Sequence, residues 1–128
     1  MIYDSKVQEK LYQIITTKMD IPCYDYIPTN SKMPYIKIDS CYYIDNSAKD
    51  INSISLVQYV QVFSDYKGKK EIRDIVAEMN DKVLDDWNDE DMQILPEIEL
   101  VRMSEHKNKD GSFYNQATVM YKFTIFEK

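Results

Sequence analysis

Near the end of the chain, the segment NQATVMYKFTIFEK alternates between apolar and polar residues. Its apolar residues occupy every second position from Ala117 to Ile125, with Thr118, Lys122 and Thr124 between them. A period of two is typical of a β-strand that buries one face and leaves the other more polar. We therefore predict a long strand here, with one face buried against the core and the other face more polar.

A turn signal and a second strand-like segment precede this strand. Asp110-Gly111 is a dipeptide that favours turns with positive φ. The segment MQILPEIELVRMSEH lies before it, and Pro96 predicts that its first part is an edge or a bulge, because proline cannot donate to a sheet ladder. The sequence thus predicts a long C-terminal β-hairpin. Its charged tip contains three residues that we expect on an assembly surface: Lys107, Asn108 and Lys109.

The segment SISLVQYVQVFSDY is the strongest strand signal in the chain. Aromatic and β-branched residues dominate it, and they fall on both faces, which predicts a central strand. The polar stretch DNSAKDINS before it has no period and reads as an exposed loop. We expect this loop to form the second part of the assembly surface, with Asn46, Ser47, Ala48, Lys49, Asp50 and Ile51.

Two segments have helical spacing. Apolar residues from Val7 to Met19 recur every three or four positions, so we predict a helix that starts near Ser5 and ends before Ile21, which precedes a proline. A second helix is predicted from Ile72 through Trp87, although the lysines before it oppose the helix dipole.

Two shorter strands are predicted at residues 23–26 and 35–44, joined by the polar loop PTNSKMP. In the second strand Ile36, Ile38 and Ser40 alternate with Tyr35, Lys37, Asp39 and Cys41, so one face is mostly apolar. The whole order predicts a single α+β domain over residues 1–128, with two helices packed on one face of an antiparallel or mixed sheet.

Composition narrows the classes of function. The formal net charge of −6 argues against binding to a phosphate backbone, although an acidic wall would suit a protein that DNA only passes. The N-terminus has no signal-peptide pattern, and no run reaches the length of a membrane helix. Cys23 and Cys41 lack metal-site spacing, and we expect reduced thiols in a cytoplasmic setting.

No catalytic motif is visible. His106 is the single histidine and lies in a charged segment that we expect to be an exposed loop, without the converging ligands that a metal needs. With only Gly68 and Gly111, the chain has no phosphate-cradling loop. The acidic run DDWNDED lacks the pattern of a calcium loop. We therefore expect a protein without enzymatic activity, cofactor or metal.

The sequence resembles the tail-terminator proteins of long-tailed bacteriophages and prophages, also described as tail-completion or head-tail joining proteins. The first match is YDYIPTNSKMPYIKI, the second is YVQVFSDYKGKKEIRDIVAEMNDKVLDD, and the third is the closing hairpin. Together they span nearly the whole chain. Phe63 stands where tryptophan is frequent in the family. The positions that carry the resemblance are Tyr24, Asp25, Pro28, Pro34, Tyr35, Ile36, Ile38, Phe63, Gly68, Asp110 and Gly111.

This resemblance implies a ring, usually of six subunits in the family, that caps the tail tube, ends its polymerisation and offers a surface for the head. The implied partners are further copies, the tail tube protein, and a head-completion or connector protein or sheath, with DNA passing through the lumen. The implied location is the head-proximal end of the tail in the virion, after assembly in the host cytoplasm. Three alternatives stay open: a collar protein of a headless tail-like bacteriocin, an acidic inhibitor or immunity-type binding protein, and a small enzyme using His106.

Overall fold

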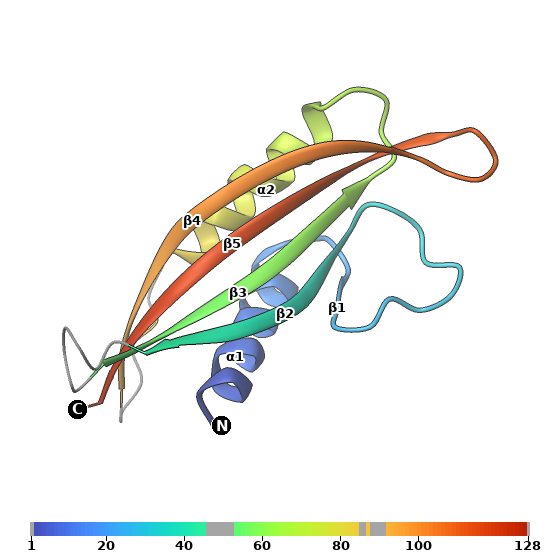
Figure 1. The fold of residues 1–128 in the computed structure, drawn as a ribbon. Coiled ribbons are helices and arrows are strands. Elements are labelled where there is room, and N and C mark those ends of the chain that lie inside the picture. The colour runs from blue at the N-terminus through green and yellow to red at the C-terminus, as the bar shows by residue number, and fades with distance from the viewer. Residues whose placement is uncertain (1, 46–52, 85–86, 88–91, 128) are drawn as a thin grey trace.

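The computed structural model describes residues 2–45, 53–84, 87 and 92–127. The loop expected at residues 46–51 therefore lies outside the described residues. The elements are α1 (Ile2–Lys18), β1 (Cys23–Tyr24), β2 (Tyr35–Asp45), β3 (Ser53–Ser64), α2 (Lys70–Val83), β4 (Met92–Lys107) and β5 (Phe113–Glu127). Figure 1 shows one twisted sheet with the helices against it.

The described strands form a five-stranded mixed sheet in the order β1-β2-β3-β5-β4. The pairs β2–β3, β3–β5 and β4–β5 are antiparallel, whereas β1 runs parallel to β2. The central position predicted for β3 and the edge position predicted for the proline-containing β4 are both confirmed. The α+β class with a long C-terminal hairpin is confirmed as well.

Both helices pack on one face of the sheet, and the core lies between the two layers. Burial along β5 alternates without a break from Asn115 to Ile125, as its sequence predicts. Val60 and Val62 of β3 face the same side and belong to one buried core cluster with Leu11 of α1 and Met79 of α2, all of them fully buried. We call the opposite face of the sheet the outer face; no helix of the described chain covers it.

Two register irregularities interrupt the ladders of the described sheet. The β2–β3 register shifts between Ile38 and Cys41. As a result Cys41 and Tyr43 pack against the core, although strict alternation placed Cys41 on the polar face. The second shift lies between Ile98 and Leu100 on β4, two residues after Pro96, which itself stays in register with Phe123.

The fully buried side chain of Gln58 fills the first irregularity. Its Nε2 lies within hydrogen-bond distance of three carbonyls and shares its two N–H groups among them: Asp39 at 2.7 Å, Ser40 at 3.2 Å and Tyr59 at 2.8 Å. Its Oε1 accepts a hydrogen bond of 3.3 Å from Nε2 of Gln8 on α1. The amide thus provides partners for the carbonyls of the shifted segment and links it to α1.

The helix limits differ from the predicted ones. Helix α1 begins at Ile2, before the predicted start at Ser5. Helix α2 ends at Val83, with Leu84 as its C-cap and 43% exposed. Trp87 is nevertheless 2% exposed, because its ring packs 4.5 Å from the ring of Phe123 on β5. Its core position therefore does not follow from helical spacing.

Candidate functional site

The β4–β5 hairpin extends past the end of β3, which pairs with β5 only as far as Ser64 and Asn115. Figure 1 shows its tip projecting beyond the rest of the sheet. The tip is closed by hydrogen bonds between the backbones of Asn108 and Ser112 at 2.7 Å and of Gly111 and Asn108 at 3.1 Å. Gly111 has a φ of 91°, as the predicted turn requires.

The carboxylate of Asp110 stabilises this turn from within. One of its oxygens accepts hydrogen bonds from the backbone N–H of Ser112 at 2.9 Å and from its hydroxyl at 2.6 Å. These bonds lower the pKa of Asp110 below its ordinary value. The tip is therefore an ordered, polar projection that carries two exposed lysines, Lys107 and Lys109.

A row of rings crosses the outer face of the sheet near the same end. Tyr35 lies 5.1 Å from Phe63, Phe63 lies 6.3 Å from Tyr114, and Tyr114 stacks on His106 at 5.2 Å between ring centroids. Tyr24 continues the row at 6.1 Å from Tyr35, so it spans all five strands. We call these five residues the aromatic row.

A polar network lies beside the aromatic row on the outer face. Oε1 of Gln61 accepts hydrogen bonds from Thr118 at 2.7 Å and from Gln116 at 2.9 Å, which joins β3 to β5. Nε2 of Gln61 reaches the carboxylate of Asp39 on β2 at 3.4 Å. These side chains bond to one another across three strands, and the bonds hold this part of the outer face in one arrangement.

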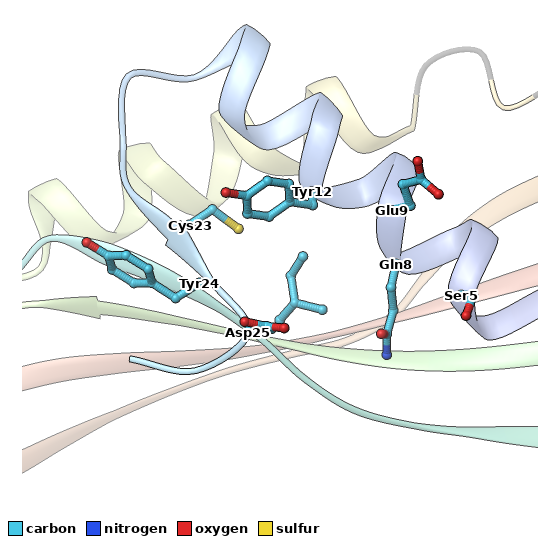
Figure 2. Close-up of a pocket in the computed structure, with 8 residues that line it drawn as sticks. Ser5, Gln8, Glu9, Tyr12, Cys23, Tyr24 and Asp25 are labelled. Carbon is cyan, nitrogen blue, oxygen red and sulfur yellow. The ribbon is translucent and has the colours of Figure 1, made fainter. Parts of the chain in front are cut away.

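A groove of about 390 Å³ lies at the opposite edge of the sheet, between α1 and β1. Its walls carry two tyrosines and two carboxylates, and Figure 2 shows Tyr12 and Asp25 on opposite sides of the opening. Burial, with a smaller effect from the charge of Asp25, raises the pKa of the Cys23 thiol to about 12. The residues that line this α1–β1 groove are Ser5, Gln8, Glu9, Tyr12, Cys23, Tyr24, Asp25 and Ile38.

The groove contains no visible catalytic arrangement. The Cys23 thiol is protonated at neutral pH and has no histidine beside it, since His106 lies on β4 at the other edge of the sheet. His106 belongs to a strand and not to the predicted loop, and its Nε2 lies 2.9 Å from Oγ of Ser104. Within the described residues, no group of three or more His, Cys, Asp or Glu side chains could hold a metal ion.

The structure sorts the residues that sequence alone singled out. Tyr24, Tyr35 and Phe63 meet in the aromatic row, and Ile36 and Ile38 lie in the core. Other predicted positions lie in turns. The backbone carbonyl of Gly68 accepts a 2.9 Å hydrogen bond from the side chain of Asn115, and the carbonyl of Pro28 accepts one from the hydroxyl of Ser31. Met33-Pro34 is a cis peptide. Asp25 borders the groove, and Asp110 and Gly111 form the hairpin turn.

Sequence reasoning missed two members of the aromatic row, Tyr114 and His106. Tyr114 stands between the turn and the alternating segment, and its partner Phe63 lies about two-fifths of the chain length away in sequence. Only the pairing register of β3, β5 and β4 brings these rings together. One signal in the sequence could have found Tyr114. The alternation of the last strand, extended backward, places Tyr114 on its more polar face.

No helix among the described residues is long and apolar enough to cross a membrane. No family model matches the sequence, and no curated protein matches it either. Its fold is similar to that of a chain in the structure described as "Virion of native gene transfer agent (GTA) particle", with a TM-score of 0.59 at 15% sequence identity. The likeness covers 95% of this chain and 92% of that chain, so the two share a fold over nearly their full lengths.

Proposed function

We propose that this chain is a structural protein of a phage-like virion and that copies of it close a ring on the end of the tail tube. The observation that carries the proposal is the fold that it shares with a chain of a gene transfer agent virion, over nearly the full length of both. The resemblance of its sequence motifs to tail-terminator proteins selects the tail end among the positions in such a particle.

The surfaces of the domain support a role in assembly. The aromatic row and the polar network form an ordered outer face, and aromatic residues are enriched where proteins meet. The hairpin tip and the α1–β1 groove lie at opposite edges of the sheet. Contacts made through two different surfaces are heterologous, and they close into a ring when the rotation between copies permits.

In this proposal the ring ends tube polymerisation and gives the head its docking surface. Its partners are copies of itself, the tail tube protein, and a head-completion or connector protein or sheath, at the head-proximal end of the tail. The net charge of −6 suits a lumen through which DNA passes without adhering. No catalytic step, cofactor or sequence-specific DNA contact is needed.

The experiment that tests this function mixes the purified chain with tail tube protein during polymerisation. Negative-stain electron microscopy then measures tube lengths and the appearance of the tube ends. We expect shorter tubes of limited length with an added ring at one end, and class averages of that ring give its number of copies. Unchanged tube lengths and bare ends would contradict the proposal.

Experiments with the purified chain and with purified particles distinguish the three alternative functions. A stable, salt-sensitive one-to-one complex with a basic protein, in place of a ring, would indicate an inhibitor or immunity-type protein. Purified particles that contain the chain on tubes without heads would identify the collar of a tail-like bacteriocin. Retained biological activity in a His106→Ala variant would exclude an enzyme that uses this histidine.

A further inference from the structure

The α1–β1 groove has the chemistry to bind a cation beside an aromatic or aliphatic group. Glu9 and Asp25 supply two exposed carboxylates at its rim, and Figure 2 shows the Asp25 carboxylate at the opening. Tyr12 and Tyr24 supply aromatic surface, and Ile38 supplies an apolar floor. A segment with basic and aromatic side chains a few ångströms apart would fit both the carboxylates of the rim and the apolar lining of the groove.

The hairpin tip carries such a segment. The ring of Phe113 is 55% exposed, and Nζ of Lys107 lies 5.8 Å from its centroid. Lys109 is exposed in the turn. The turn also contains the carboxylate of Asp110, one oxygen of which accepts two hydrogen bonds from Ser112, and the two lysines outnumber this single negative charge.

The groove and the tip cannot meet within one chain. The strand order β1-β2-β3-β5-β4 places β1, which borders the groove, at one edge of the sheet and β4, which leads into the tip, at the other. Figure 1 shows the tip pointing away from α1 and β1. A contact between the two surfaces therefore joins separate copies head to tail, which is the relation that a ring requires.

We propose that the hairpin tip of one copy occupies the α1–β1 groove of the next copy. Phe113 packs against Tyr12 and Ile38, while Lys107 and Lys109 pair with Glu9 and Asp25. This contact rests on the proposed function, because it specifies how the subunits of the ring recognise one another. The occupant is a second copy of this chain, and a basic segment of another protein is an outcome that the test distinguishes.

Charge reversal tests the contact on both sides. The tip variant is Lys107→Glu with Lys109→Glu, and the groove variant is Glu9→Lys with Asp25→Lys. All four side chains are exposed, so we expect the variants to retain the fold. Matched controls reverse exposed charges elsewhere: Lys67→Glu with Lys69→Glu for the tip variant, and Glu78→Lys with Asp81→Lys for the groove variant.

Sedimentation equilibrium over a wide concentration range measures association of the free chain, and electron microscopy measures rings on tube ends. We expect each reversal to weaken association by at least about 100-fold, because like charges then face each other across the contact. The controls should associate as the wild-type chain does. A variant that carries all four reversals restores opposite charges and should regain both association and rings.

The results separate the contact from the function. If the tip variant forms rings as well as the wild-type chain does, the contact is overturned while the ring proposal stands on another surface. The groove variant can lose rings while the tip variant keeps them. This result also overturns the contact, and it assigns the groove to a different protein. A wild-type chain that stays monomeric, both free and at tube ends, overturns the contact and the proposed function together.

Discussion

Nε2 of Gln58 on β3 donates a 2.7 Å hydrogen bond to the backbone carbonyl of Asp39 on β2, at the point where the register between these strands shifts. The side chain is fully buried, and its oxygen accepts from Gln8 of α1. One amide therefore fixes the shifted segment, the strand beside it and the first helix. This arrangement positions β1 and β2, which border both the α1–β1 groove and the aromatic row.

Replacing Gln58 with Leu should destabilise the fold by about 1–3 kcal/mol, because the carbonyls of Asp39 and Ser40 lose a buried donor. Chemical denaturation followed by circular dichroism measures this loss. The control is Gln13→Ala on the exposed face of α1, which should change stability by less than about 0.5 kcal/mol. Equal effects of the two substitutions would show that the amide does not hold the shifted segment.

The Cys23 thiol should resist alkylation in the folded protein. Burial raises its pKa from 9.0 to about 12, so little thiolate is present at pH 8. In a Cys41→Ser background, where Cys23 is the one remaining thiol, we expect iodoacetamide to react at least about 100-fold more slowly in buffer than in denaturant. Similar rates in the two conditions would contradict the buried position.

The same thiol gives stability a defined dependence on alkaline pH. The folded state holds the Cys23 proton up to about pH 12, whereas the unfolded chain releases it near 9.0. Its stabilising contribution is therefore fully present at neutral pH and falls as the pH rises from 9 toward 12. A Cys23→Ala variant should show a shallower fall over this range in urea titrations. If the free energy of unfolding falls equally steeply with pH in both proteins, the Cys23 thiol is not the source of the dependence.

Gly111→Ala should loosen the hairpin tip without affecting the core. A Cβ at this position meets no atom within 4 Å, so the cost comes from the backbone at a φ of +91° and is about 1–2 kcal/mol. Amide exchange of Asn108, whose N–H donates to Ser112, should accelerate, while β3 amides keep their protection. Gly111→Asn should cost less, because asparagine tolerates positive φ better. Unchanged exchange at Asn108 would contradict the turn geometry.

The aromatic row makes a prediction about assembly. Tyr114→Ser removes the ring that links Phe63 to His106, and each lost aromatic pair costs about 0.5–1.5 kcal/mol of stability. If the outer face contacts the tube or a neighbouring copy, this variant should fold but cap tubes poorly. Tyr66→Ser, which removes a ring that is 54% exposed and outside the row, should cap normally. If both variants cap tubes normally, the aromatic row is not part of the assembly surface.

The elements with a clear period could be predicted from the sequence. Alternation in β5, the turn at Gly111 and the proline in β4 define the hairpin and its edge position, and all of these features are local. The face on which Cys41 lies could not be predicted. It depends on a register shift that the partner strand stabilises through Gln58, which is distant in sequence.

The candidate surfaces were less accessible to sequence reasoning, for the same reason. Tyr24, Tyr35 and Phe63 are conspicuous in the sequence, but their alignment with Tyr114 and His106 requires the order of all five strands. Trp87 keeps helical spacing and yet lies beyond the end of α2, because packing on Phe123 places it in the core. Tertiary contacts decide these positions, and local periodicity in a single sequence does not show which distant residues meet.

We propose that copies of this chain close a ring on the tail tube, and the length and end structure of growing tubes test this most directly. Tail tube protein is polymerised with increasing amounts of the purified chain, and electron microscopy records tube length and end structure. The proposal predicts that tube length falls as the chain is added, and that every shortened tube carries a ring at one end. Tubes that grow to the same length with bare ends at all concentrations would contradict it.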